Sequence, residues 1–289
     1  MKKATPYLLL LPALLFTFLV LVYPLFQNLL NSFQNVSLMK GVTGWAGFQN
    51  YVKILKDDIF WLSFKNTAMY AFLGTLFSML FGLGMALLLN SQVGKINNVF
   101  KFLYTIPWVV SPVVAGFAWK WILNDNFGLI NYWLKNWGII DENITWLGSS
   151  DTALISVIVA RVWQFYPFAM VMFLAGLQAI PQQLYEAADV DGASAPRKFF
   201  HITFPHISSV TSVLLLLGLI WSFNDFNMVF VMTRGGPINA SMVLPVWVRE
   251  LSFMYFDLGR GSALSIITFT ILISLSFVYL KIISRRESL

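Results

Sequence analysis

Long apolar runs, separated by shorter polar segments, make up most of this chain of 289 residues. Six runs reach the roughly 20 residues that a helix needs to cross a bilayer core about 30 Å thick. None shows the alternation over about ten residues that is typical of membrane β-strands. The pattern predicts an all-α integral membrane protein with six transmembrane helices, at residues 7–30, 66–90, 99–123, 152–177, 207–233 and 262–280.

Prolines within the later spans predict kinks. Pro107 and Pro112 lie in the third span, and Pro167 lies in the fourth. A proline inside a helix frees a backbone carbonyl, which neighbouring helices must satisfy in lipid. The first span is too long for a secretory signal and lacks a small-residue cleavage site, so we expect it to be retained.

The composition supports a membrane protein and excludes several other classes. Hydrophobic residues make up 58% of the chain and charged residues 11%, whereas soluble domains have about half and about a quarter. Cysteine is absent, which excludes disulfides, thiolate metal sites, iron–sulfur clusters and cysteine nucleophiles. The net charge of +6 is spread between long neutral runs, a distribution that does not favour binding to nucleic acid.

Six spans place both chain ends on the same side of the membrane. With the ends inside, the inner and outer segments each hold nine lysines and arginines, so the raw positive-inside count is tied. The inner segments are shorter, however, and their charges lie next to the helix ends. The charge density therefore predicts a multi-pass protein with both termini in the cytoplasm.

The three outer loops, at about 31–65, 124–151 and 234–261, are long and aromatic. Tryptophan is enriched at the headgroup level of membranes, which makes these loops candidates for interfacial anchors. They are equally candidates for a docking surface for an external partner, and the sequence leaves both open. The tryptophans concerned are Trp45, Trp61, Trp133, Trp137 and Trp146.

Lys101 and Lys120 lie near the ends of the third span, where long side chains can reach the interface. Two other charged residues lie deeper inside predicted spans, Arg161 in the fourth and Asp225 in the fifth. A charge at membrane depth costs about 3 kcal/mol or more and normally faces a bundle interior or a water cavity. At 1.5 Å per residue, they lie about 15 Å and about 12 Å below the outer ends of their spans, close enough in depth to pair. The sequence leaves open whether they form a structural ion pair or line a cavity. Polar and aromatic neighbours would complete such a cavity: Trp163, Gln164, Phe165, Phe168, Trp221, Ser222, Asn224 and Asn227.

The segment between the fourth and fifth spans, residues 179–206, has the pattern of a helix–turn–helix. Pro181 suits the first turn of a helix. Gly192 signals a turn and a helix end. A second short helix is predicted at residues 197–203, ended by Pro205. Such a short and exposed hairpin could transmit force to a soluble partner.

A specific motif lies within this segment. It consists of Glu186-Ala187-Ala188, three residues, Gly192, nine residues, and then Ile202-Thr203-Phe204-Pro205. The motif resembles the EAA loop of permease subunits of bacterial ATP-binding-cassette (ABC) importers, with Phe204 in place of the usual leucine. Other segments resemble the carbohydrate-uptake branch of this family, of the maltose and glycerol-phosphate type: Trp163, Tyr166-Pro167, Leu177-Gln178-Ala179-Ile180-Pro181 and Thr233-Arg234-Gly235-Gly236-Pro237.

The resemblance implies that residues 1–289 form a single ABC importer permease domain whose loop seats in a cleft of a cytoplasmic ATPase. In this role Glu186 would pair with a basic group on the ATPase, and Gly192 would permit the turn. Phe199 and Phe200 would pack the loop back under the spans. The expected ATPase-coupling residues are Glu186, Ala187, Ala188, Asp191, Gly192, Phe199 and Phe200.

The sequence contains no G-x-x-x-x-G-K-[ST] phosphate loop, so ATP hydrolysis is expected in another chain. The two histidines, His201 and His206, lie in the loop and are expected to be surface or packing residues rather than a metal pair. We expect no catalytic residue, metal or cofactor in this chain, with ATP and Mg²⁺ bound by a partner ATPase. The resemblance implies the following partners in a bacterial cytoplasmic (inner) membrane: a second, similar permease subunit in a heterodimer, two cytoplasmic ATP-binding subunits, an extracytoplasmic solute-binding protein and membrane lipid.

The resemblance also implies substrate contacts around the Tyr-Pro of the fourth span and upstream of the Gly-Gly-Pro turn. Amides and acids hydrogen-bond to sugars there, and aromatic faces stack on the pyranose ring. Arg161 exceeds what a neutral sugar requires; if it is unpaired, it favours an anionic substrate such as a uronate oligosaccharide or glycerol phosphate. The expected substrate-binding residues are Arg161, Gln164, Phe165, Phe168, Gly218, Trp221 and Ser222, with Asn224 and Asp225 beside them.

The leading prediction is the permease subunit of an ATP-driven, binding-protein-dependent importer for an oligosaccharide or a related carbohydrate. A membrane-embedded enzyme would need paired acidic motifs or a histidine near the membrane face. An autonomous channel or secondary transporter would need more ionisable residues within the spans, or an inverted repeat. Neither pattern occurs in the sequence, so both are weaker alternatives.

Overall fold

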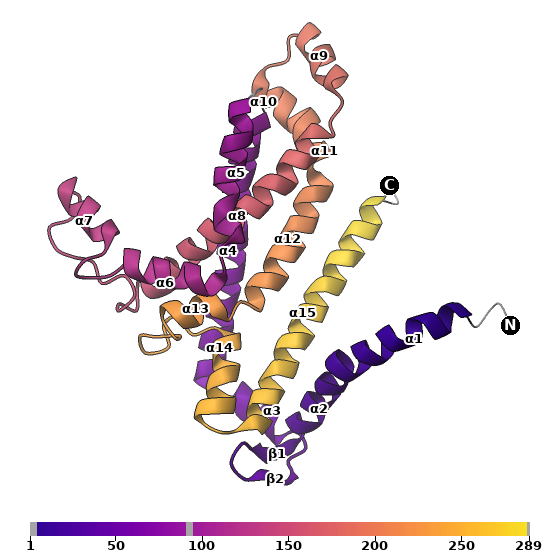
Figure 1. Cartoon of the computed structure of the whole chain (residues 1–289), viewed down its shortest axis with the longest axis vertical. Helices are drawn as coiled ribbons and strands as arrows, with labels where there is room; N and C mark the ends of the chain where they lie inside the picture. Colours follow the sequence, from indigo (N-terminus) through magenta and orange to yellow (C-terminus); the bar gives the residue numbers. More distant parts are fainter. Residues whose placement is uncertain (1–4, 91–94, 288–289) are drawn as a thin grey trace. The chain divides into compact units, whose positions relative to one another are not determined.

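The computed structural model describes residues 5–90 and 95–287 of the chain (Figure 1). The predicted cytoplasmic chain ends, residues 1–4 and 288–289, lie outside the described residues. Packing divides the chain into two compact units. Unit 1 comprises Met1–Trp61 and Leu244–Leu289, and unit 2 comprises Leu62–Val243. Each unit is described by itself.

The predicted all-α membrane fold is confirmed. Four helices are long and apolar enough to cross a membrane, or up to six if each of two bent helix pairs is one span. The four continuous candidates coincide with the first, second, fourth and sixth predicted spans. They are Leu9–Ser32, Asp58–Asn90, Ala153–Gln178 and Leu258–Lys281.

The third predicted span, by contrast, is a broken helix. It consists of α5 (Lys95–Val109) and α6 (Pro112–Ile122), which are bent by 95°. Ser111, which precedes Pro112, has the extended ψ of 137°, because the proline ring disfavours a helical conformation in the residue before it. The break therefore lies at Pro112, one of the predicted kink positions.

The fifth predicted span is also discontinuous, so the prediction of one helix over 207–233 is wrong within residues 224–226. Helix α12 (Ser208–Phe223) ends there, and the short α13 (Asn227–Met232) follows. The fourth span, α8 (Ala153–Gln178), continues as helix through Pro167.

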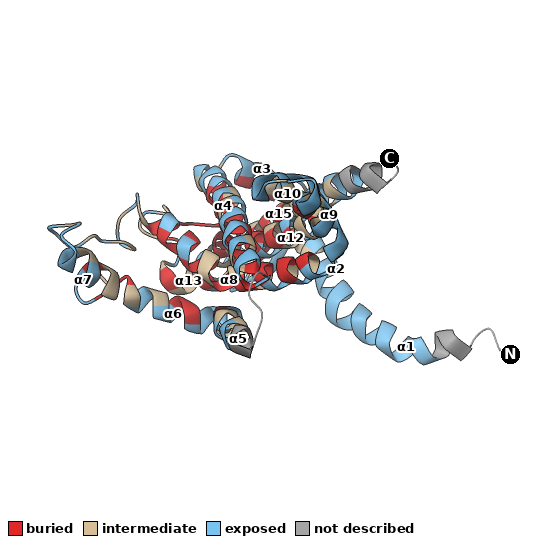
Figure 2. Ribbon diagram, turned by 90° about the horizontal axis from the view of Figure 1, so that it is seen from above, coloured by how far each residue is buried: buried red, intermediate tan, exposed pale blue. Residues whose placement is uncertain are grey.

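Unit 1 is built around the last helix, α15 (Leu258–Glu287), against which α2 (Tyr23–Ser32) and α3 (Gln49–Leu55) pack. The side-chain amide of Asn50 joins α3 to the end of α2 and to the residues that follow it, because it donates to the carbonyls of Ser32, at 3.0 Å, and Gln34, at 2.9 Å. The apolar window of the first span has no buried residue (Figure 2), as suits a helix that faces lipid. The other elements of the unit are α1 (Thr5–Thr17), η1 (Phe18–Val22), the antiparallel pair β1 (Gln34–Ser37) and β2 (Gly41–Trp45), α14 (Leu244–Arg249) and η3 (Glu250–Met254).

Unit 2 has α8 at its centre. This helix is the most buried of the four continuous candidates, with 61% of its apolar window inside the chain, and it packs against α5, α6, α12 and α13. The remaining elements are most of α4 (Asp58–Asn90), α7 (Leu129–Asn136), α9 (Gln182–Val190), α10 (Ala195–Lys198), η2 (Phe199–Thr203) and α11 (Phe204–His206).

Helices α4 and α8 approach closely at Gly82. A Cβ atom on this residue would lie 2.7 Å from the Cβ of Ala169 and 2.8 Å from the backbone nitrogen of Met170. On the same helix, a Cβ on Gly84 would have no other atom within 4 Å. The close approach of the two helices therefore requires glycine at position 82 but not at position 84.

We expect Gly82→Ala to lower the free energy of unfolding by about 1–3 kcal/mol, because the added methyl group forces the two helices apart. The matched control, Gly84→Ala, should be neutral or stabilising by up to about 1 kcal/mol, since alanine favours helix. Thermal unfolding of the purified variants in detergent measures both. Equal midpoints for the two variants would contradict the packing argument.

Candidate functional site

The two charges predicted at membrane depth meet inside unit 2. Nη1 of Arg161 lies 3.8 Å from Oδ2 of Asp225, and both side chains are about nine-tenths buried. The hydroxyl of Tyr70 donates to the same carboxylate oxygen at 2.6 Å. The guanidinium also lies over the ring of Phe165, 4.7 Å from its centroid, a cation–π contact. Of the two arrangements that the sequence left open, the structure contains the ion pair, and a tyrosine of α4 is a third member of the network.

Asp225 lies in the break between α12 and α13 and helps to begin the second helix. Its Oδ1 accepts a hydrogen bond from the backbone N–H of Met228, in the first turn of α13, at 3.3 Å. A carboxylate at this position also interacts favourably with the positive end of the helix dipole. One carboxylate therefore joins α4, α8 and the start of α13.

Gln164, one turn further along α8, reaches the other helix break. Its Nε2 donates to the backbone carbonyl of Val110, at 3.2 Å, in the break between α5 and α6. A proline-induced break frees carbonyls that must find other donors within a membrane protein. Gln164, which is 5% exposed, provides such a donor.

Several buried polar atoms around this network have no hydrogen-bond partner within the part of the chain that the structure describes. They come from α4, α8 and α12, and we call them together the polar layer. Buried polar groups are normally paired, and this layer therefore has spare hydrogen-bonding capacity. The atoms are Nε and Nη2 of Arg161, Oε1 of Gln164 and the hydroxyl oxygens of Thr75, Ser78 and Ser222.

Four aromatic rings from three helices form what we call the aromatic cluster: Trp108 of α5, Phe165 and Phe168 of α8, and Trp221 of α12. Phe168 is central, with its centroid 5.2 Å from that of Trp108 and 5.2 Å from that of Trp221. Phe165 completes the cluster at 5.5 Å from Phe168. Phe165 is 2% exposed, whereas Trp108 and Trp221 are 46% and 42% exposed. The cluster therefore has a buried base and accessible indole rings.

The other predicted substrate residues have different surroundings. Gly218 allows α12 to approach α4 and α8, because a Cβ there would lie 2.5 Å from Cγ2 of Thr75. Ser222 is buried. Asn224 is exposed and its amide donates back to the carbonyl of Ile220. Asn224 therefore makes none of the described contacts with the charge network or the aromatic cluster.

Sequence reasoning missed Tyr70 and Trp108. A signal for Tyr70 existed, since Asn66, Tyr70, Gly74 and Ser78 recur every four residues and are all buried. Residues four apart lie on one face of a helix, so the stripe marks the side of α4 that packs inward. Trp108 follows directly after Pro107, near the predicted kink.

The predicted helix–turn–helix is present at one end of unit 2 (Figure 1), and we call α9 to α11, residues 182–206, the hairpin. Gly192 has φ +70°. Its N–H bonds to the carbonyl of Asp189, and the N–H of Ala193 bonds to the carbonyl of Ala188. These two bonds make a Schellman motif, in which the left-handed position favours glycine. The turn at Gly192 therefore sets the direction in which the chain leaves α9.

The second helical run of the hairpin is longer than predicted. It extends over Ala195–His206 and is bent by 63° from α12, so Pro205 lies within the run and does not end it. Pro196 occupies its first turn, where the missing N–H costs nothing.

The hairpin exposes most of the residues predicted to couple to an ATPase. Glu186, Ala187 and Asp191 are exposed. The prediction that Phe200 packs the loop under the spans is wrong, because its side chain is 65% exposed. Phe199 is half-buried and packs against the rings of Phe200 and Phe204.

Other residues attach the hairpin to the bundle. The hydroxyls of Tyr185 and Thr203 lie 2.8 Å apart in a hydrogen bond. Tyr185 and Ile202 also pack against the hydrophobic core that includes Leu177 at the end of α8 and Ile207 before α12. The hairpin is thus continuous with the packed core of unit 2.

The family described as "Binding-protein-dependent transport system inner membrane component" matches residues 78–288 of this chain. The chain belongs to this family. The resemblance to ABC importer permeases that the loop motif indicated is therefore confirmed, and the protein is a translocation subunit rather than an enzyme.

Known permeases match this chain over almost its whole length. It is 34% identical over 281 residues to the sulfoquinovosyl glycerol transport system permease protein SmoG of Agrobacterium fabrum, covering 97% of this chain and 90% of the relative. It is 35% identical over 284 residues to the trehalose/maltose transport system permease protein MalF of Thermococcus litoralis, and the match covers 96% of this chain and 92% of that relative.

A solved structure shows the same fold. A chain in the crystal structure of a bacterial ABC transporter involved in the import of the acidic polysaccharide alginate superposes with a TM-score of 0.84. The sequences are 22% identical, and the match covers 99% of this permease and 96% of that chain.

The permease has no metal-binding group of three or more histidine, aspartate or glutamate residues within residues 5–90 and 95–287. The Nδ1 atoms of His201 and His206 lie 3.0 Å and 2.6 Å from the carbonyls four residues earlier, those of Arg197 and Ile202. Both rings therefore interact with their own helical run.

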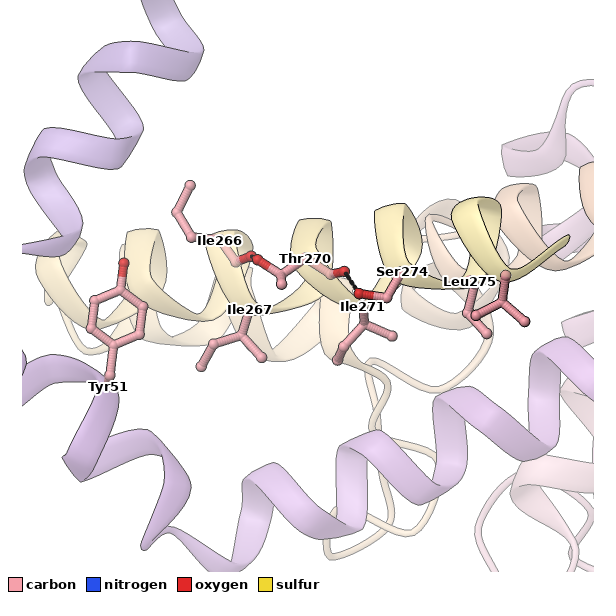
Figure 3. Close-up of a pocket in the computed structure, with 8 residues that line it drawn as sticks. Tyr51, Ile266, Ile267, Thr270, Ile271, Ser274 and Leu275 are labelled. Carbon is pink, nitrogen blue, oxygen red and sulfur yellow. Dashed lines mark hydrogen bonds between the residues drawn. The ribbon is translucent and has the colours of Figure 1, made fainter. Parts of the chain in front are cut away.

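Unit 1 of the permease carries an apolar groove of about 430 Å³ along α15 (Figure 3). The hydroxyls of Thr270 and Ser274, which line it, donate to the backbone carbonyls of Ile266 and Thr270. Tyr51, at one end, shares a hydrogen bond with Ser32. Because these hydroxyls are paired, the groove offers little hydrogen bonding to a sugar, and it is a poor candidate for a carbohydrate site.

Proposed function

We propose that this permease is the membrane-spanning subunit of a carbohydrate importer. The observation that carries the proposal is the aromatic cluster of unit 2 with the buried hydroxyl groups of Thr75 and Ser222 near it, since ring faces and a few convergent polar groups suit a sugar. The matched permeases that transport trehalose/maltose and sulfoquinovosyl glycerol support it. The substrate residues are then Phe168, Trp221 and Trp108 at the accessible rim, with Phe165 below them.

The preferred substrate is a neutral carbohydrate. Arg161 has its charge balanced by Asp225, and both are about nine-tenths buried. An anionic substrate such as a uronate oligosaccharide would have to bind the guanidinium of Arg161 in place of Asp225. The buried carboxylate of Asp225 would then lack its counter-charge. The ion pair therefore favours a neutral sugar over the anionic alternative.

ATP hydrolysis takes place in partner chains in this proposal. The sequence has no phosphate loop, and the hairpin is exposed at one end of unit 2. Two cytoplasmic ATP-binding subunits hold ATP and Mg²⁺; this chain and a second, similar permease form a heterodimer in the bacterial inner membrane. Both chain ends are cytoplasmic, and an extracytoplasmic binding protein delivers the sugar. The coupling residues are Glu186, Ala187, Ala188, Asp191, Gly192, Phe199 and Phe200.

The mechanism follows from a two-state equilibrium. ATP binding closes the partner ATPases, and the hairpin moves with them. The helix bundle then shifts from an inward-open to an outward-open state, because a ligand favours the conformation that it binds more tightly. The binding protein releases its sugar onto the aromatic cluster, and hydrolysis returns the bundle to its first state.

The aromatic cluster is tested by substitution of Trp221 in the assembled importer. We expect Trp221→Ala to lower sugar uptake into vesicles at least tenfold, because it removes an accessible ring face. Trp221→Phe should keep most of the uptake, since a ring remains. The amount of ATPase that co-purifies should not change in either variant.

A matched control is Trp133→Ala. Trp133 is similarly exposed, at 47%, but stacks on Trp137 in the segment around α7, away from the cluster. Uptake by Trp133→Ala should be close to that of the unchanged protein. Equal uptake by Trp221→Ala and the unchanged protein would contradict a sugar site at the cluster.

A further inference from the structure

We propose that Arg161 and Gln164, which we call the α8 polar turn, hold the breaks of the third and fifth spans at fixed positions relative to α8 and to each other. We call this fixed arrangement the register. Helix α8 then transmits movement of the hairpin to the two breaks. The direction of transmission, from hairpin to breaks, rests on the proposed function, whereas the register itself rests on contacts within unit 2. In this arrangement Arg161, Gln164 and Tyr70 are positioning residues rather than ligands of the substrate.

The first break is held by Gln164. Its amide reaches the carbonyl of Val110 at 3.2 Å, between α5 and α6, and the side chain is buried. Helices α5 and α6 both pack against α8. Gln164 thus provides a hydrogen bond from the middle of α8 to the point where the third span changes direction by 95°.

The second break is held by Arg161. The residue reaches Asp225 in the break between α12 and α13, and Tyr70 fixes the same carboxylate from α4. Because Asp225 also accepts the N–H of Met228, movement of α8 at Arg161 acts directly on the first turn of α13. Helices α12 and α13 both pack against α8 as well.

The far halves of the two broken spans also contact each other. Helix α6 packs on α13, and a Cβ on Gly116 would lie 2.9 Å from Cγ1 of Val231. The two short helices therefore approach too closely for a side chain at position 116. Since α8 holds the start of each one through residues three positions apart on one face, the breaks are coupled through α8 and through this contact.

The same helix leads to the hairpin. From Arg161 to Gln178, the last residue of α8, the helix spans about 26 Å at 1.5 Å per residue. Leu177 at its end lies in the core against which Tyr185 and Ile202 of the hairpin pack. A continuous, packed helix with its ends attached in this way is a physical route for coupling.

The absence of cysteine from the chain allows a site-by-site test in the complete importer in nanodiscs. Single cysteines replace Ser111, which precedes α6, and Asn227, which begins α13; both are exposed. The rate of labelling by a maleimide is measured with and without a non-hydrolysable ATP analogue. In otherwise unchanged protein, we expect the nucleotide to change the rate at both positions at least fivefold.

The second set of variants separates the two breaks. Gln164→Met should reduce the nucleotide effect at position 111 to less than twofold and keep the effect at 227. Asp225→Asn should reduce the nucleotide effect at position 227 to less than twofold and keep the effect at position 111. If Asp225→Asn does not assemble, Tyr70→Phe weakens the same contact more mildly and should give the same pattern. The control Val162→Ala alters the same turn of α8 without touching its hydrogen bonds and should keep both effects.

The outcomes distinguish this inference from the proposed function. In one outcome, the nucleotide effect is present in the unchanged protein, while Gln164→Met and Asp225→Asn each change it equally at positions 111 and 227 or change it at neither position. This result overturns the register, and the importer assignment stands. If the nucleotide has no effect at either position in the unchanged protein, transmission from the hairpin is overturned together with the proposed coupling. Position-specific loss supports the inference, because general destabilisation would affect both positions.

Discussion

Gly192→Val is expected to reduce uptake at least tenfold and to remove the ATPase from the purified importer. Gly192 has φ +70° and is the left-handed residue of a Schellman motif. A residue with a side chain pays about 1–2 kcal/mol in this conformation, and valine is stiffer because it is branched at Cβ. The turn then opens, and α9 no longer presents Glu186 in the same direction. Co-purification of the ATPase and uptake into vesicles measure the effect.

Unit 2 contains a second turn of the same kind, which provides a matched control. Gly138 ends α7 with φ +66°, and the carbonyls of Lys135 and Leu134 accept the N–H groups of Gly138 and Ile139. Gly138→Val therefore imposes the same backbone strain away from the hairpin. The ATPase should still co-purify with this variant. If both variants lose the ATPase equally, general destabilisation rather than the hairpin explains the result.

Charge reversal at Glu186 tests the charge of the hairpin without changing its backbone turn. Glu186 is exposed, so Glu186→Arg should leave the thermal midpoint unchanged within the range of surface substitutions, about 0.5 kcal/mol. A like charge facing the basic group proposed on the ATPase should still weaken the association. Glu186→Gln should have a smaller effect. ATPase retained equally by all three forms would contradict the role of this residue.

Arg161→Gln is expected to be among the most destabilising single substitutions in unit 2, at about 3 kcal/mol or more. Removing one partner leaves the carboxylate of Asp225 buried without its counter-charge. The double variant Arg161→Gln/Asp225→Asn should be more stable than Arg161→Gln alone, because no unpaired charge remains and neutral side chains can still hydrogen-bond. A thermal-unfolding double-mutant cycle measures the coupling between the two residues.

Uptake by the same variants tests the substrate class. For a neutral sugar, uptake should fall in Arg161→Gln and recover in part in the double variant, following the stability. For an anionic substrate that binds Arg161, uptake would stay low in the double variant despite its recovered stability. The second outcome would contradict the proposal of a neutral substrate. A double variant less stable than both single variants would contradict the ion pair as a stabilising contact.

Hydropathy alone determined which segments are membrane helices, but it did not determine whether each helix is continuous. All six predicted stretches are largely helical, because a run of about 20 apolar residues must satisfy its backbone groups internally in lipid. The breaks at residues 110–111 and 224–226 leave the apolar pattern intact, and a window average cannot detect them. Pro112 indicated the break at residues 110–111. Asp225 lies in the break at residues 224–226, but the sequence analysis considered only its charge.

The candidate site was predicted in part for a similar reason. Arg161 and Asp225 stood out because charges are rare in apolar spans, and equal depth suggested that they meet. Tyr70 and Trp108 were missed because tyrosine and tryptophan are common in membrane helices, and their roles depend on which neighbours they face. The partner of Gln164, the carbonyl of Val110, is a backbone group that every sequence would supply.

The amino-acid sequence by itself determined the class of protein, the helical segments and the loop motif that places the chain among importer permeases, because these depend on local composition and spacing. Only the tertiary structure decided that a single turn of α8 reaches both helix breaks and that four rings from three helices converge. Those features depend on distances between helices far apart in the chain. Side-chain packing sets these distances, and periodicity within one helix carries no information about them.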